Sequence, residues 1–175
     1  GVRVNERAPG RLGWGAGYNT RDGFGGFLEL AHDNLGGMGR RASIRGQMTL
    51  EPGDLVPSQY LGMIGFREPR LRDSLWSFKT NLIGERTTRS VDQFNLEHLS
   101  LVTSLDRPIG RRLGTGIELE TDWSDVFDVA EDAVLTPEDE GTSHTVALSP
   151  FLVYEGRDDP FAPRRGVFDS VRLRY

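Results

Sequence analysis

The chain has 175 residues and a net charge of −5, and it contains no cysteine. These values exclude a disulfide framework and a thiolate metal site, and they argue against a nucleic-acid-binding protein that neutralises phosphates. No apolar run reaches the ~18 residues of a membrane helix, but a transmembrane β-strand needs an apolar residue only at every second position, so a soluble all-β domain and a membrane β-barrel both remain open.

The start of the chain leaves two interpretations open, a mature chain or a piece of a longer protein, and we favour the piece. Position 1 is Gly rather than Met, and no charged-then-apolar signal pattern follows it. The first regular pattern begins a few residues later. Its apolar side chains alternate with glycine, at Leu12, Gly13, Trp14, Gly15, Ala16, Gly17 and Tyr18. This period of two predicts a β-strand with a face that carries no side chains.

The same alternation recurs along the rest of the chain, and we predict about nine strands of about 8–13 residues. Apolar positions share a face at Ala42, Ile44, Met48 and Leu50; at Tyr60, Ile64 and Phe66; at Trp76, Phe78 and Leu82; at Leu113, Ile117, Leu119 and Trp123; at Val146, Leu148, Leu152 and Tyr154; and at Val167, Val171, Leu173 and Tyr175. Between Leu96 and Leu99 the apolar parity changes, which predicts a β-bulge.

Polar residues occupy the opposite face of these strands. If the sheet closes into a barrel, they are candidates to line its lumen. The candidates are Arg45, Gln47, Lys79, Asn81, Glu118, Glu120, Asp122, Arg172 and Arg174.

The connections between the strands differ in kind. Counted in order, the even ones are compact and carry arginine, whereas the largest odd one, residues 125–141, is strongly acidic. Up-and-down connectivity places the even and odd connections on opposite rims of a barrel, and short turns on one rim with longer loops on the other are typical of outer-membrane barrels. This pattern favours a barrel over a β-sandwich.

The last connection, Arg157 to Gly166, predicts a fixed turn. Pro160 and Pro163 cannot donate hydrogen bonds to a neighbouring strand, and Gly166 can adopt a backbone conformation closed to other residues.

Several motifs together resemble one family. The glycine-rich segment 12–18 with Arg21-Asp22-Gly23-Phe24, the turn Asn34-Leu35-Gly36-Gly37-Met38-Gly39, and the turn Asp158-Asp159-Pro160-Phe161 occur in the order and at the spacing of the BamA/TamA-type outer-membrane assembly factors, the bacterial surface antigen family. The opening Val2–Glu6 resembles the last strand of the polypeptide-transport-associated (POTRA) domain that precedes the barrel in that family.

The resemblance implies an all-β fold: an antiparallel up-and-down transmembrane β-barrel of sixteen strands, of which this chain supplies about nine. Residues 1–9 would be the end of a periplasmic POTRA domain or a linker, and residues 10–175 the first half of the barrel. The implied location is the bacterial outer membrane. The implied partners are unfolded outer-membrane protein clients, the lipid bilayer, and periplasmic chaperones or accessory assembly subunits.

The implied activity is insertion or translocation of other β-barrel proteins through a lateral opening at the first barrel strand. Segment 12–18 is then the candidate gate that pairs with a client, because its glycines weaken the strand and reduce side-chain packing. The alternative is that these small residues only relieve crowding inside the barrel.

Two other functions stay open: a secretion pore or passive channel built on the same barrel, such as a two-partner secretion transporter, and a soluble β-sandwich binding module. We expect no enzyme, cofactor or metal site, since His32, His98 and His144 are isolated and no phosphate-binding loop or nucleophile elbow occurs.

Overall fold

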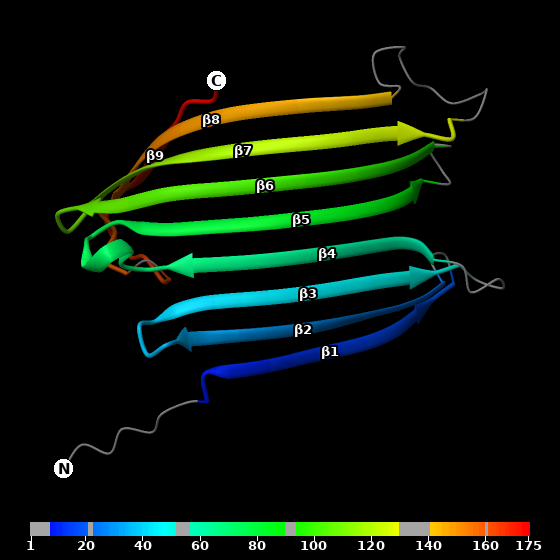
Figure 1. Ribbon diagram of the computed structural model, residues 1–175. Helices are drawn as coiled ribbons and strands as arrows, with labels where there is room; N and C mark the ends of the chain where they lie inside the picture. The colour runs from blue at the N-terminus through cyan, green and yellow to red at the C-terminus, as the bar shows by residue number, and fades with distance from the viewer. Residues whose placement is uncertain (1–7, 21–22, 52–56, 90–93, 130–140, 160) are drawn as a thin grey trace.

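The computed structural model describes residues 8–20, 23–51, 57–89, 94–129, 141–159 and 161–175. These residues form one sheet of nine antiparallel strands in the order β1 to β9, so each strand lies between its sequence neighbours (Figure 1). The strands are β1 (Gly10–Asn19), β2 (Gly23–Leu35), β3 (Arg40–Leu50), β4 (Pro57–Glu68), β5 (Ser77–Arg89), β6 (Phe94–Ile109), β7 (Leu113–Phe127), β8 (Gly141–Glu155) and β9 (Phe168–Arg172), with a 3-10 helix, η1 (Leu71–Asp73), between β4 and β5. The predicted all-β, up-and-down architecture is confirmed.

The described residues form a single-layered sheet, and none of them forms a second sheet against it. Among the described residues only two apolar side chains are buried, those of Ala31 (7% exposed) and Ala147 (3% exposed). A β-sandwich would bury the apolar face of each sheet against the other. The β-sandwich alternative is therefore wrong for this chain.

Cross-strand pairing collects the large apolar side chains on one face. Leu12 pairs with Leu30, Leu30 with Ile44, and Ile44 with Ile64, and the row continues across the sheet through Leu82 and other residues. We call this side of the sheet the apolar face. It carries Leu12, Trp14, Tyr18, Phe24, Leu28, Leu30, Ile44, Met48, Tyr60, Ile64, Leu82, Leu99, Leu101, Ile117, Leu119, Trp123, Val146, Leu148, Leu152, Tyr154 and Val171, all at least 37% exposed.

The predicted bulge in the sixth strand is wrong. β6 pairs with β5 and β7 without any shift of register from Asn95 to Asp106. The parity change arises because Leu96 lies on the opposite face from Leu99, within a regular strand. The register shifts that do occur lie between His32 and Leu35 in β2 and between Thr49 and Leu50 in β3.

The connections lie on two opposite rims (Figure 1). The even rim is the end of the sheet at which β2, β4, β6 and β8 end and holds the described residues of the connections 36–39, 69–76, 110–112 and 156–167, and the odd rim is the opposite end, at which β1, β3, β5 and β7 end. The expected separation by length is not found, because 156–167 on the even rim is longer than three of the odd connections. Of the acidic loop, Asp125 belongs to β7, and residues 130–140 lie outside the described residues.

The odd and even connections differ in the charge of their sequences. The odd connections contain Asp22, Glu51, Asp54, Asp92, Asp128, Glu131, Asp132, Glu138, Asp139 and Glu140 with one base, Arg21. The even connections contain Arg70, Arg72, Arg111, Arg112, Arg157, Arg164 and Arg165 with three acids, Asp73, Asp158 and Asp159. By sequence, the odd connections are thus acidic and the even connections basic.

The connection between β8 and β9 is a fixed turn, as predicted. One carboxylate oxygen of Asp158 accepts hydrogen bonds from the backbone N–H groups of Arg164 (3.0 Å) and Arg165 (3.1 Å). Asp159 accepts hydrogen bonds from the backbone N–H groups of Phe161 and Ala162. Gly166 has a φ of +110°, which side chains strongly disfavour.

Candidate functional site

The candidate gate segment forms most of β1, an edge strand. Among the described residues β1 pairs only with β2, with Leu12 opposite Leu30 and Tyr18 opposite Phe24. Leu12, Trp14 and Tyr18 are 64%, 75% and 67% exposed, more than most apolar side chains in the middle of the sheet. Segment 12–18 thus lies in the first strand of the sheet, and its role as a gate stays a prediction.

The pairing pattern indicates which backbone groups point away from β2. The N–H of Asp33 donates to the C=O of Pro9 at 2.8 Å, and hydrogen-bonded pairs alternate with non-bonded pairs along an antiparallel ladder. Odd-numbered residues of β1 therefore bond to β2. The N–H and C=O groups of Leu12, Trp14, Ala16 and Tyr18 therefore point away from β2.

The three glycines of the segment have different surroundings. A Cβ atom at Gly15 would lie 2.6 Å from the Phe27 ring, whereas a Cβ at Gly13 would meet Glu29 at an ordinary 3.7 Å and one at Gly17 would meet nothing within 4 Å. Crowding accounts for a small residue at Gly15. It does not account for Gly17, where a side chain would have open space.

All nine polar candidates lie on the other side of the sheet, which we call the charged face. The strand register from β2 to β9 places them there, on β3, β5, β7 and β9 and just beyond β9. They are Arg45, Gln47, Lys79, Asn81, Glu118, Glu120, Asp122, Arg172 and Arg174. Whether this face lines a lumen stays a prediction.

The structure joins most of these candidates in pairs rather than in one cluster. Lys79 Nζ lies 3.0 Å from Asp106 Oδ1, and Arg174 Nη2 lies 3.2 Å from Glu120 Oε2. Arg172 forms an ion pair with Glu118. The Oδ1 atom of Asn81 lies beside Gly65, where an added Cβ would come within 3.0 Å of it.

Two candidates form pairs with histidine or an aromatic ring. Asp122 Oδ1 lies 3.2 Å from His98 Nε2. The Arg45 guanidinium lies over the Phe27 ring at 4.6 Å from its centroid, 3.7 Å from Glu29 Oε2, and donates a hydrogen bond of 3.3 Å to Gln47 Oε1. Such mixed and mostly paired charges suit a solvated surface rather than acid–base chemistry.

Sequence reasoning missed several members of this face. Glu29, His98 and Asp106 were not among the candidates, and neither was Asp33, which lies between Arg11 and Arg41. The alternation of side chains along β2 alone would have placed Glu29 and Asp33 on one face of the sheet and Leu28 and Leu30 on the other. Within the described residues no group of three or more His, Asp or Glu side chains could hold a metal ion, and no helix is long and apolar enough to span a membrane.

Comparison with known proteins identifies the fold. The family model described as the Omp85 superfamily domain matches residues 34–175. Among solved structures, the crystal structure of BamA from Haemophilus ducreyi lacking POTRA domains 1–3 is similar, with a TM-score of 0.63 and 16% sequence identity. The alignment covers 95% of this chain and 34% of that one, so this chain spans about a third of the length of that structure. No curated protein matches the sequence.

Proposed function

The chain belongs to the Omp85 superfamily and forms part of a bacterial outer-membrane β-barrel, and from this premise we propose that its protein inserts other β-barrel proteins into the outer membrane or moves them across it. The observation that supports the proposal is the first strand of the sheet, β1, whose even-numbered residues direct their backbone N–H and C=O groups away from β2. These outward-pointing backbone groups can accept a further strand, in the same way that extended peptides add to exposed sheet edges. The proposed insertion or translocation involves no covalent step, which is consistent with a family of assembly and transport proteins.

A client strand would pair with the backbone of Leu12, Trp14, Ala16 and Tyr18. Main-chain hydrogen bonds impose no side-chain requirement on the partner, which suits clients of many different sequences. Gly17 supports the proposal, because crowding does not demand a glycine there. The same arrangement implies unfolded outer-membrane proteins as partners, with periplasmic chaperones or accessory subunits delivering them.

The charge of the rims supports an orientation. We infer that the basic even rim faces the periplasm, where arginines can contact the phosphates of the inner leaflet. The acidic odd rim then faces outward. In this orientation the end of β1 next to Pro9 is its periplasmic end, where clients arrive.

Site-directed disulfide cross-linking tests the proposal. Single cysteines at Trp14 and Ala16 would be combined, in the protein as the cell makes it, with single cysteines along the terminal strand of a model client. We expect disulfides whose best client position moves by two residues when the β1 cysteine moves by two. Ile64→Cys is the matched control, because it shares the apolar face but lies in β4, between two paired strands. Clients that insert normally while neither β1 cysteine forms a disulfide would contradict the proposal.

A second candidate function is a secretion pore or passive channel, and the charged face favours it. Its nine polar candidates would line the lumen, and their mixed charge predicts little preference between anions and cations. Conductance in planar bilayers, measured beside client insertion in vesicles, separates the two functions. Steady conductance without insertion would select the channel.

A further inference from the structure

Most basic side chains of the strands are paired with an acid, but a group of arginines at the even rim is not. The strand residues that form an ion pair with a carboxylate include Arg11, Arg40, Arg41, Arg45, Lys79, Arg86 and Arg172. The even-rim arginines that form no ion pair with any described carboxylate include Arg70, Arg72, Arg107, Arg111 and Arg112. The connections 69–76 and 110–112 contain a single acid, Asp73, so this part of the rim carries an excess of positive charge.

Arg107 and Trp76 lie side by side on the apolar face at this end of the sheet. Leu105 is opposite Phe78, and Arg107 and Trp76 each lie two residues nearer the even rim, which places them on the same face. The Arg107 guanidinium lies 5.3 Å from the centroid of the Trp76 ring. Its Nε atom is buried with no hydrogen-bond partner among the described residues. A guanidinium stacked in this way keeps its outer N–H groups available for an anion.

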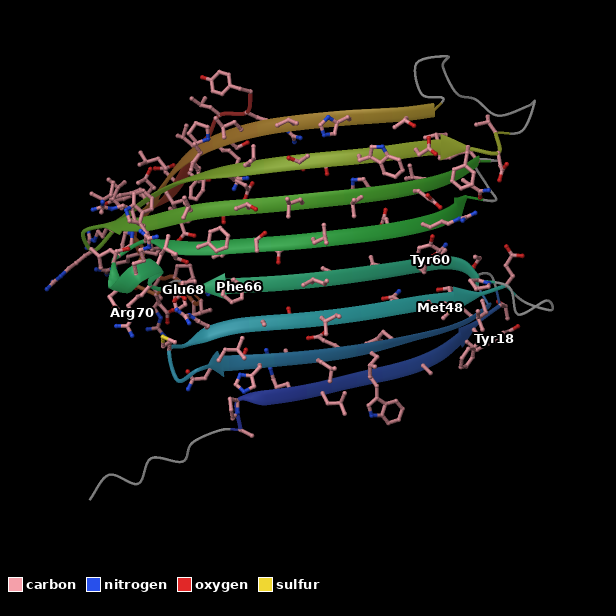
Figure 2. All side chains as sticks on the ribbon, viewed as in Figure 1. Tyr18, Met48, Tyr60, Phe66, Glu68 and Arg70 are labelled. Carbon is pink, nitrogen blue, oxygen red and sulfur yellow. The ribbon has the colours of Figure 1, made fainter. Side chains whose placement is uncertain are left out.

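The carboxylate at this end of β4 is already used. Glu68 is 6% exposed and forms an ion pair with Arg40. Arg70 lies two residues beyond Glu68, next to the end of β4 (Figure 2). The residue after Arg70 donates its backbone N–H to the C=O of Trp76 at 2.8 Å. Trp76 therefore has Arg70 on its β4 side and Arg107 on its β6 side, and both cations lack an acid partner among the described residues.

Connection 69–76 exposes apolar side chains beside these arginines. Leu71 is 37% exposed and Leu75 is 64% exposed. The backbone N–H groups of residues 71, 73, 74 and 76 donate hydrogen bonds to oxygen atoms of the same connection. Because these donors need no water, the connection can enter the boundary of a bilayer at little cost. Exposed leucines beside arginines are typical of segments that lie in the membrane interface.

We propose that Arg70, Trp76 and Arg107 bind the phosphate of an anionic phospholipid, with Leu71 and Leu75 against its acyl chains. Arginine donates paired hydrogen bonds to phosphate oxygens, and an arginine on a lipid-facing surface requires a partner. The excess of positive charge favours an anionic headgroup over a zwitterionic one. The proposal rests on the orientation given under the proposed function, in which the even rim meets the phospholipid leaflet, and it does not require that the protein inserts clients.

Native mass spectrometry of the complete protein in detergent, titrated with phosphatidylglycerol, tests the proposal. We expect Arg107→Gln to weaken the tightest phosphatidylglycerol binding about fivefold and the double variant with Arg70→Gln about 25-fold, from the contribution of one arginine near an anionic membrane surface. Arg70→Gln alone, next to an exposed connection, repeats the test away from the Trp76 stack and should also cost about fivefold. Unchanged binding in both single variants would overturn the proposal.

Arg67→Gln is the matched control. Arg67 is an exposed arginine near the same end of β4, it forms no ion pair with a described carboxylate, and it lies opposite Lys79 on the charged face. Its loss removes the same charge from the opposite face, so phosphatidylglycerol binding should not change. Equal losses in Arg67→Gln and Arg107→Gln would mean that overall charge, rather than this site, attracts the lipid, and would overturn the proposal.

Two further measurements distinguish the lipid from other ligands. Inorganic phosphate in excess should displace little phosphatidylglycerol, because Leu71 and Leu75 contribute to binding of the lipid alone. Complete displacement would indicate a site for free phosphate and would contradict the proposal. If the arginine variants keep phosphatidylglycerol but lose a periplasmic protein that co-purifies with the unsubstituted protein, the surface is a protein interface and the proposal is wrong.

This test fails separately from the proposed function, because lipid binding is measured without clients. If Arg70 and Arg107 bind phosphatidylglycerol but clients never cross-link to β1, the lipid site stands and the proposed function is wrong. If clients cross-link to β1 and the arginine variants bind phosphatidylglycerol as before, the proposed function stands and the lipid site is wrong.

Discussion

Gly166 occupies a position that no other residue can take without strain. Its φ is +110°, and an added Cβ would lie 2.3 Å from the Gly156 carbonyl oxygen and 2.6 Å from the Arg157 Cα. Both of these atoms belong to the backbone, so a side chain at this position would require the backbone itself to shift. We expect Gly166→Ala to lower the free energy of unfolding by about 1–3 kcal/mol, measured by urea titration with tryptophan fluorescence. Gly46→Ala, which meets nothing within 4 Å, should change it by less than about 0.5 kcal/mol. Equal stability of the two variants would contradict this geometry.

Asp158 makes the same turn sensitive to acid. Backbone N–H groups of Arg165 and Arg164 donate to its carboxylate and hold its pKa below the ordinary value. A lowered folded pKa means that the charged carboxylate stabilises the turn above its unfolded pKa, and that this contribution is lost as the pH falls through the folded pKa.

We therefore expect Asp158→Asn to be less stable than the unsubstituted protein at pH 7, with the difference shrinking as the pH falls below about 4. Urea midpoints measured from pH 7 to pH 2 would show this convergence. Asp73→Asn removes a carboxylate from another connection on the even rim and serves as the control. A difference that stays constant across this pH range would argue against the role of Asp158.

At the scale of elements, β9 is fastened to a strand that is not its neighbour. Arg172 and Arg174 reach over β8 to Glu118 and Glu120 of β7. The Arg172 guanidinium lies over the Phe151 ring of β8, 5.3 Å from its centroid, and the small β8 side chains of Ala147 (3% exposed) and Ser149 (4% exposed) are buried on the same face. The ion pairs thus span three strands across one aromatic and two small side chains of the middle strand.

Ala147→Leu should disturb this arrangement. The larger side chain has no space on the charged face, so we expect a loss of about 1–3 kcal/mol in unfolding free energy, as for overpacked sites. The adjacent Val146, on the apolar face and 55% exposed, gives the matched control Val146→Leu, which should be nearly neutral. Urea titration of both variants checks the difference, and hydrogen exchange of the β9 amides should rise only in Ala147→Leu.

The strands also show which features of the fold could be predicted from the sequence. Alternation with a period of two assigned β1, β3, β7 and β8 to strands and divided their residues between the correct faces, because parity alone decides the face. Parity does not give register, so the pairing of Lys79 with Asp106 and of Arg11 with Asp33 could not be foreseen. In β6 the prediction of a bulge rested on the expectation that Leu96 and Leu99 share one face. Leu96 instead lies on the charged face of a regular strand, so the change of parity does not mark a bulge.

At the scale of the whole molecule, the two faces of one thin sheet meet different surroundings. Figure 2 shows Tyr18, Met48 and Tyr60 at the odd-rim end and Phe66, Glu68 and Arg70 at the even-rim end. Leu101 lies between these ends, on the row of the apolar face that runs through Leu82. The outward face of an outer-membrane barrel contacts lipid tails, so we predict that this row lies in the apolar interior of the bilayer.

We expect Leu101→Arg to cost about 2–4 kcal/mol when the complete protein folds into lipid vesicles, the range for arginine near the bilayer midplane. Val102→Arg, one residue later, places the same side chain on the charged face opposite Glu120 and Asn81. There it can stay hydrated and pair with a carboxylate, so we expect a change below about 1 kcal/mol. Urea-dependent folding into vesicles measures both values. Similar costs for the two substitutions would mean that the two faces do not differ in their exposure to lipid, whereas the expected contrast would assign the apolar face to the membrane and the charged face to water.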